Sequence, residues 1–142
     1  MVYFLLRFIR KRKQSEVQPA VNISPGEEYL MRIGQEINPK GNNLSEMTNR
    51  LSRIFREYLA REFKIPAREA SSTEIIENLE AINIEAEDLN KLKELFKQLD
   101  LINFAGGRVD PAEFSNIYGS IETFLLKQKK IWEAENEQVK EA

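Results

Sequence analysis

The sequence predicts an all-α fold: a compact bundle of about five helices with a long C-terminal helix, preceded by a basic membrane-proximal stub and a tether. Three observations support this prediction. Apolar residues recur at intervals of three and four over most of residues 25–136. No segment there alternates between apolar and polar residues, as a half-buried strand does, for more than a few positions. Several of the five prolines and six glycines stand where the apolar patterns begin or stop, so they separate the helices.

The first helix is predicted from the segment SPGEEYLMRIGQEI. Ser24 is suited to cap it, Pro25 is favoured at the first helical position, and Glu27 completes a capping box with Ser24. The turn sequence NPKGNN, with Pro39 and Gly41, is expected to end it. Its apolar face consists of Tyr29, Leu30 and Ile33.

The second helix is predicted over residues 44–63, because the apolar residues there form one stripe and charged residues occupy the remaining surface. We expect this helix to end before Pro66. Charges four residues apart are expected to pair along it, namely Glu46 with Arg50, Arg53 with Glu57, and Glu57 with Arg61. The apolar stripe consists of Leu44, Met47, Leu51, Ile54, Phe55, Tyr58, Leu59 and Phe63.

Two further helices follow. Ser71 or Ser72 is expected to cap the third helix. The fourth is predicted from NIEAEDLNKLKELFKQLDLI, where Glu85, Glu87 and Asp88 are favourably placed near the positive end of the helix dipole. The residues expected to be buried are Ile75, Ile76, Leu79 and Ile82 in the third helix, and Leu89, Leu92, Leu95, Phe96 and Leu99 in the fourth.

The last helix is predicted to start after a turn at Gly106-Gly107, where Asp110, Pro111 and Glu113 repeat the capping pattern. A small hairpin around Leu101–Val109 is an alternative for the preceding segment. Gly119 is expected to let a neighbouring helix approach closely. The long apolar face of this helix consists of Phe114, Ile117, Tyr118, Ile121, Phe124, Leu125, Gln128 and Trp132.

The chain is therefore divided into residues 1–13, a membrane-proximal stub; 14–24, a linker; 25–136, the helical domain; and 137–142, a frayed tail. Residues 1–14 carry five basic residues and no acidic one. The remaining 16 basic and 23 acidic residues give a net charge of −7. An acidic body argues against nucleic-acid binding, for which a broad positive surface is expected.

Residues 1–13 are predicted to be the end of a transmembrane helix with a basic flank. The stretch from Val2 to Ile9 is apolar except for Arg7 and has eight residues, whereas a span needs about 20, so it does not cross a bilayer alone. Basic residues after such a run are typical of the cytoplasmic side and are attracted to anionic lipid. A short amphipathic anchor, or an extra strand or helix packed on the domain, remains an alternative. The membrane-proximal residues are Tyr3, Phe4, Arg7, Arg10, Lys11, Arg12 and Lys13.

The sequence predicts no catalytic site, no cofactor and no metal. It contains no His and no Cys, and therefore lacks the commonest general base, zinc ligand and thiol nucleophile. It also has no glycine-rich phosphate loop and no nucleophile elbow. The densest carboxylate cluster, Glu85, Glu87 and Asp88, stands where a helix start favours acidic residues in any case.

Three single residues and one group of arginines are assigned roles. Asp100 is expected to end a helix and to accept hydrogen bonds from backbone N–H groups of the following turn. Phe104 is expected to fill the core, and Trp132 to pack on the first helix rather than to anchor a partner. A nucleic-acid-binding face on the second helix is the alternative reading of Arg50, Arg53, Arg56 and Arg61, but Glu46, Glu57 and Glu62 are interleaved with them.

The segments LSRIFREYLAREFKIPAREASSTEIIENL and LFKQLDLINFAG resemble the cytoplasmic C-terminal region of BatD-like proteins of bacterial aerotolerance (Bat) operons. The resemblance covers residues 3–132. Where that family often has Cys and Lys around the second motif, this chain has Leu99 and Asn103, which favours a structural role for the motif. The matching residues are Tyr58, Leu59, Arg61, Phe63, Ile65, Pro66, Ala67, Thr73, Glu74 and Ile75, and then Asp100, Leu101, Ile102, Phe104 and Ala105.

The resemblance implies a single-pass membrane protein whose helical domain lies at the cytoplasmic face of the bacterial inner membrane. Its implied partners are von Willebrand A-domain membrane proteins and a MoxR-type AAA+ ATPase. Anionic lipid near residues 1–13 is expected from their basic charges. The expected function is non-enzymatic docking within such a complex. A small helical regulatory domain that binds nucleic acid, or one that binds lipid peripherally, is the alternative.

Overall fold

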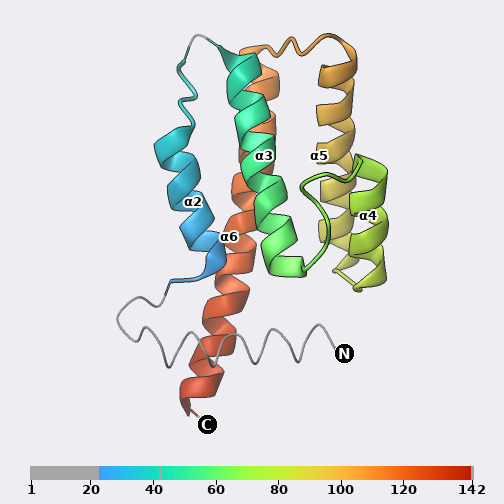
Figure 1. Cartoon of the computed structure of the whole chain (residues 1–142). Coiled ribbons are helices and arrows are strands. Elements are labelled where there is room, and N and C mark those ends of the chain that lie inside the picture. The colour runs from blue at the N-terminus through green and yellow to red at the C-terminus, as the bar shows by residue number, and fades with distance from the viewer. Residues whose placement is uncertain (1–22, 42, 142) are drawn as a thin grey trace.

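The computed structural model of the chain describes residues 23–41 and 43–141, with side chains as far as residue 137. The described part consists of α-helices joined by short connections, without a strand, so the all-α prediction is confirmed (Figure 1). The predicted stub, residues 1–13, and most of the predicted linker lie outside the described residues. The helices are α2 (Pro25–Glu36), α3 (Leu44–Phe63), α4 (Ser72–Ala81), α5 (Ala86–Phe104) and α6 (Pro111–Glu141).

The long helix α6 organises the bundle, since it contacts α2, α3 and α5 (Figure 1). α2 and α3 also pack on each other, and α4 packs on α5 at the other side of the molecule. α4 has 10 residues and α5 has 19, so α4 lies beside only the first part of α5 and leaves its last turns uncovered (Figure 1). The start of α2 and the end of α5 lie at opposite ends of the bundle.

The apolar stripes predicted from the sequence meet in one core. Its centre is aromatic: the ring centroids of Phe55 and Phe124 are 5.7 Å apart, and those of Tyr29 and Tyr58 are 5.4 Å apart, each pair edge to face. Edge-to-face pairs of this kind stabilise a fold by about 0.5–1.5 kcal/mol beyond the burial of their area. The largest fully buried side chains are Tyr58, Phe55, Phe96, Leu51, Ile54, Leu59, Ile75, Leu79, Leu92, Ile117, Ile121 and Leu125.

Side-chain caps fix where α2, α3, α4 and α6 begin, and those at Ser24, Ser71 and Asp110 were predicted. The predicted capping box at Ser24 forms only in part, because the Glu27 carboxylate pairs with Lys129. Asp110 and Glu113 form a complete capping box, in which Asp110 Oδ1 accepts from the Glu113 N–H at 2.8 Å and Glu113 Oε1 accepts from the Asp110 N–H at 3.1 Å. Single cap bonds, each typically worth about 1 kcal/mol, are accepted by Ser24 from Glu27 N–H, by Asn43 from Glu46 N–H and by Ser71 from Glu74 N–H.

The expectation for Gly119 is wrong, and another glycine has the role assigned to it. A Cβ built at Gly119 would have no neighbouring atom within 4 Å, whereas one at Gly26 would lie 2.8 Å from the carbonyl oxygen of Leu125. The start of α2 therefore packs on α6 at a distance that only glycine permits. α6 itself continues to Glu141, past residue 136, where the sequence predicted that the ordered domain would end.

The surface charges of α3 connect it to α2. The predicted pair of Glu46 and Arg50 forms at 3.2 Å. Glu57 is paired with Arg32 of α2, and Arg61 Nη1 lies 2.8 Å from a carboxylate oxygen of Glu28, also in α2. Glu57 and Arg61, which were expected to pair with each other along α3, therefore pair with residues of α2, because α2 packs against their side of α3. Among the described helices, none combines the length and the apolar character needed to cross a bilayer.

Candidate interaction surface

The connection between α3 and α4, which carries part of the resemblance, is held by Arg56. α3 ends at Phe63, and its C-cap residue Lys64 has a φ of 58°, which reverses the chain. Residues 65–70 then return along the domain. Arg56 donates hydrogen bonds to the carbonyl oxygens of Ala67 at 3.3 Å and Ala70 at 2.7 Å. Its guanidinium carbon lies 5.6 Å from the ring centroid of Phe96. Burial lowers the pKa of the Arg56 guanidinium, and the charge of Asp100 opposes this shift. Arg56 is therefore a structural residue.

Asp100 connects the two segments that carry the resemblance. Its Oδ1 accepts a hydrogen bond of 2.8 Å from the hydroxyl of Ser72, the first residue of α4. The expectation that Asp100 ends a helix is wrong, since α5 continues to Phe104. The backbone N–H groups after Asp100 consequently belong to the helix, and its side chain bonds to α4 instead. This bond connects the start of α4 to α5 at Asp100, just before the last turn of α5, which α4 leaves uncovered.

Most other residues of the two motifs also have structural roles. The Glu74 N–H bonds to the Ser71 hydroxyl at 3.2 Å, so this acidic residue belongs to the cap of α4. Pro66 and Thr73 are exposed, and Pro66 lies between the buried residues Ile65 and Ala67. The buried motif residues are Tyr58, Leu59, Phe63, Ile65, Ala67, Ile75 and Ile102.

Leu101 and Phe104, which we call the apolar tip, are the exception. The prediction that Phe104 fills the core is wrong: 95% of its surface is exposed, together with 62% for Leu101. The buried stripe of α5 includes Leu99 and Ile102. A residue two positions after Ile102 points about 200° away from it around the helix. Phe104 therefore faces solvent because α5 is one turn longer than the sequence indicated.

The apolar tip lies at a helix end whose last carbonyl groups accept backbone hydrogen bonds. The N–H of Ala105 donates to the carbonyl of Leu101 at 3.0 Å, and the N–H of Gly107 donates to that of Ile102 at 2.8 Å. Gly106 and Gly107 have φ of 89° and 81°, which glycine adopts without strain. The exposed pair is thus part of the ordered helix and its cap rather than of a loose loop.

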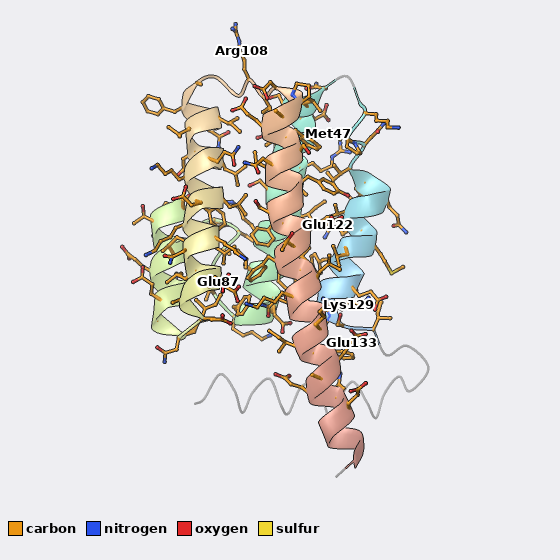
Figure 2. All side chains as sticks on the ribbon, turned by 180° about the vertical axis from the view of Figure 1, so that it is seen from behind. Met47, Glu87, Arg108, Glu122, Lys129 and Glu133 are labelled. Carbon is orange, nitrogen blue, oxygen red and sulfur yellow. The ribbon has the colours of Figure 1, made fainter. Side chains whose placement is uncertain are left out.

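Positive charges without a partner lie near the apolar tip. Lys97 precedes Leu101 by one helical turn, and Arg108 follows the glycine turn, where it points away from the end of the bundle (Figure 2). Within the part of the chain that the structure describes, neither residue forms an ion pair. The acidic residues that follow, Asp110 and Glu113, cap α6. We call Lys97 and Arg108 the basic rim.

Two carboxylates of the cluster noted at the start of α5 form ion pairs with a lysine of α6. Lys127 Nζ of α6 lies 2.9 Å from Asp88 Oδ1 and 3.2 Å from Glu85 Oε2. These hydrogen bonds raise the pKa of Lys127, and the bond with Asp88 has the larger effect. Glu87, labelled in Figure 2, pairs instead with Lys91 at 3.4 Å. Among the residues described, no group of acidic side chains is arranged to hold a metal. The cluster therefore connects α5 to α6.

Three of the four arginines considered for a nucleic-acid-binding face have partners inside the domain. These are Arg50 with Glu46, Arg61 with Glu28, and Arg56 with the carbonyls of the α3–α4 connection. Trp132 is buried, with 8% of its surface exposed, as expected for a packing residue.

Sequence reasoning missed the apolar tip as a surface, although one signal was present. The buried positions of α5 recur at Leu92, Leu95, Leu99 and Ile102, and a continuation of that stripe does not include residue 104. Comparisons of the chain with protein-family models, with curated proteins and with solved structures find no match. The resemblance to BatD-like proteins therefore stays a prediction from the residues.

Proposed function

We propose that this chain is a non-enzymatic protein-interaction domain of a single-pass membrane protein, held at the cytoplasmic face of the bacterial inner membrane. In this proposal it docks other proteins of a Bat/MoxR-type membrane-associated complex. The observation that carries the docking function is the apolar tip: Leu101 and Phe104 remain exposed at an ordered helix end.

The energetic argument concerns what the apolar tip gains in a complex. A buried Phe side chain removes about 150–250 Å² from water, and full burial of a large apolar side chain is worth about 1.5–3 kcal/mol. Phe104 contributes almost none of this to the fold, because 95% of its surface is exposed. A partner that covers it would gain that free energy, and buried aromatic side chains are the typical anchors of protein interfaces.

The membrane placement and the choice of partners have different support. They rest on the sequence of residues 1–13 and on the resemblance to BatD-like proteins. The non-enzymatic part of the proposal rests on the absence of His and Cys from the sequence. The reading frame upstream of Met1 tests the membrane placement directly: we expect it to encode a hydrophobic segment of about 20 residues, and a reading frame without one would contradict it.

Binding to the implied partners tests the docking function. The full chain is immobilised, and the purified soluble parts of the von Willebrand A-domain proteins and of the MoxR-type ATPase from the same genome are passed over it. We expect at least one of them to bind with a Kd of about 10 μM or tighter, as transient complexes do. If none of these proteins binds at a concentration about 100-fold above that Kd, the proposal is contradicted.

A further inference from the structure

We propose that the apolar tip binds a basic, amphipathic segment of another protein, whose apolar side chains cover Leu101 and Phe104 and whose Lys and Arg side chains meet the carboxylates around them. This inference rests on the proposed docking function and adds to it the location of the binding site and the chemistry of the partner. Three features carry it: the access to the apolar tip, the balance of charge around it, and its position relative to the start of α2.

The apolar tip is open to a partner. Leu101 and Phe104 stand at positions i and i+3 of α5, so one apolar segment can touch both side chains. α4 does not cover them, because Ser72 at its start is bonded to Asp100 and α5 continues for one more turn. A partner can therefore reach both side chains without moving any described helix.

Carboxylates outnumber cations around the apolar tip. Glu94 and Asp100 precede it on α5, and Asp110 and Glu113 follow it at the start of α6. We call these four residues the acidic frame. The basic rim supplies two positive charges, and the carboxylates remain in excess even when the half-buried Arg56, whose charge acts on Asp100, is counted with them. The surroundings of the apolar tip are therefore negative on balance.

The hydrogen bonds of the acidic frame leave its negative charges in place. Asp100 accepts a hydrogen bond from the Ser72 hydroxyl, and Asp110 and Glu113 accept theirs from backbone N–H groups. All of these donors are neutral. An interface of ordinary size covers about 800 Å² on each partner, which is more than two side chains provide, so a partner seated on the tip also covers part of this frame.

The charge of the whole domain acts in the same direction as the acidic frame. Residues 15–142 contain 16 basic and 23 acidic residues, which gives a net charge of −7. Opposite charges across an interface favour association and speed the approach of a partner, whereas like charges oppose it. A basic segment is therefore attracted both by the surroundings of the tip and by the rest of the domain, and an acidic protein is repelled by both.

The same charges oppose a second copy of the chain as the partner. Two copies would bring two acidic bodies together, and like charges oppose association. In a two-fold interface centred on the apolar tip, the acidic frame of one copy would also lie near that of the other. A different, basic protein satisfies these carboxylates better.

The position of the apolar tip opposes a lipid surface as the partner. The start of α2, where the preceding chain joins the domain, and the end of α5 lie at opposite ends of the bundle (Figure 1). A domain tethered to a bilayer through the residues before Ser24 therefore presents the tip on its far side. Anionic lipid would also repel the acidic body of the domain. Residues 1–13 are themselves apolar and basic, but in the proposed function they end a membrane helix.

The first variant of the full chain tests the apolar tip. Leu101→Ser with Phe104→Ser removes the tip. Its control, Met31→Ser with Leu126→Ser, removes two apolar side chains that are 53% and 41% exposed elsewhere on the surface. Exposed substitutions of this kind usually leave stability nearly unchanged, and circular dichroism and the thermal midpoint verify that all variants fold.

The second variant neutralises the acidic frame and keeps its hydrogen-bond acceptors. Asn caps a helix as well as Asp does, and Gln can replace Glu in a capping box. The frame variant combines Glu94→Gln, Asp100→Asn, Asp110→Asn and Glu113→Gln. Its control makes the same change in net charge at exposed positions on other parts of the domain, with Glu69→Gln, Glu77→Gln, Glu122→Gln and Glu133→Gln.

The third variant, Lys97→Glu with Arg108→Glu, reverses the basic rim and makes the surroundings of the tip more negative. Its control, Arg68→Glu with Lys130→Glu, makes the same change in net charge at two exposed positions away from the tip. Comparison of each charge variant with its control separates an effect of local charge from an effect of overall charge.

The probe is a library of random 16-residue peptides displayed on phage, selected on the immobilised full chain. The clones retained are those whose capture falls at least about tenfold when the tip variant replaces the unmodified chain. We expect these clones to combine apolar residues with an excess of Lys and Arg. Their capture should fall at least about threefold on the frame variant and in about 0.5 M salt, and rise about twofold or more on the rim variant. The controls should change it less.

Several results would overturn the inference. An absence of tip-dependent clones, or tip-dependent clones without a basic excess, would contradict the chemistry of the partner. Equal capture by the frame variant and its control would contradict the role of the carboxylates. Tip-dependent sedimentation with vesicles of phosphatidylcholine and phosphatidylglycerol, or tip-dependent self-association in analytical ultracentrifugation, would identify a different occupant.

The chain's own basic segment is tested separately. A variant that combines Arg10→Gln, Lys11→Gln, Arg12→Gln and Lys13→Gln should capture the retained clones as the unmodified chain does. A clear rise in capture would mean that this segment of the same chain competes for the tip, and would overturn the inference of a separate partner.

Failure of this inference is distinct from failure of the proposed function. If the von Willebrand A-domain or MoxR-type proteins bind the unmodified chain and the tip variant equally, docking stands and this location for it is wrong.

Discussion

The two ends of α5 differ in the burial and the ion pairing of their side chains. At the start, Asp88 is buried against Lys127 of α6, and every acidic residue of the first turn has a basic partner. At the end, Leu101 and Phe104 are exposed, and Lys97 has no ion pair among the described residues. The first arrangement stabilises the contact between two helices. The second contributes nothing visible to the fold, which is why we assign binding to it.

The largest expected effect comes from a comparison of two phenylalanines of the same helix. Phe96 is 1% exposed and its ring lies 6.2 Å from that of Phe55, whereas Phe104 is 95% exposed. We expect Phe96→Ala to lower the free energy of unfolding by about 3–5 kcal/mol, through lost burial and a cavity. Phe104→Ala should change it by about 0.5 kcal/mol or less. Urea unfolding at neutral pH measures both, and equal losses would show that Phe104 supports the fold.

Two aspartates of α5 provide the next comparison. The Asp88 side chain is 5% exposed and bonds to Lys127, while Asp100 is exposed and bonds to Ser72. We expect Asp88→Ala to cost about 1–2 kcal/mol, because a buried charge-assisted hydrogen bond is lost. Asp100→Ala should cost about 0.5 kcal/mol or less, because its side chain is exposed. Thermal unfolding followed by circular dichroism distinguishes the two, and a reversed order would contradict the structural role given to the start of α5.

These comparisons also indicate what could be predicted from the sequence. The apolar stripes of the five helices and the caps at Ser24, Ser71 and Asp110 follow local rules of spacing and hydrogen bonding, and they were correct. The bond between Lys127 and Asp88 joins residues 39 positions apart. No local pattern distinguishes that pair from the many other lysines and acidic residues of the chain.

The errors at Phe104 and Gly119 have one physical cause each. The sequence placed residue 104 in the turn after α5, whereas it belongs to the helix. Each helical residue rotates the side-chain direction by about 100°, so Phe104 points about 200° away from the buried Ile102. Which glycine permits a close approach depends on where two helices cross, and the crossing at Gly26 is set by the packing of α2 on α6. The sequence does not specify that crossing locally.

High pH offers a third test, directed at the start of α5. Hydrogen bonds to Asp88 and Glu85 raise the pKa of Lys127 in the folded chain. A raised pKa means that the stabilisation is complete below the ordinary lysine value of about 10.4 and is lost as pH rises through the folded value. We expect part of the decline in stability above that pH to disappear in Lys127→Met.

The matched control for the pH test is Lys97→Met at the other end of α5, which should leave the decline unchanged. Burial raises the pKa of Tyr118 as well, aided by the charge of Glu122, so some decline will remain in every variant. Urea unfolding between pH 8 and pH 11 measures the difference. An unchanged decline in Lys127→Met would mean that the contact contributes no stability.

The smallest expected effect concerns the basic rim. Lys97 and Arg108 are exposed and form no ion pair among the described residues, and substitutions at exposed positions usually change stability by about 0.5 kcal/mol or less. Lys97→Glu with Arg108→Glu should therefore lower stability only slightly, and the loss should shrink in about 0.5 M salt. A larger, salt-independent loss in urea unfolding would indicate that Lys97 and Arg108 support the fold.

The exposure of Phe104 in the free chain tests the central claim most directly. The full chain is labelled with 4-fluorophenylalanine, the signals of Phe104 and Phe96 are assigned by substitution, and a soluble gadolinium chelate is added during ¹⁹F NMR. The account predicts that the chelate broadens the Phe104 signal strongly and leaves that of Phe96 sharp. Equal protection of the two rings would contradict it, because another part of the chain would then already cover the surface assigned to a partner.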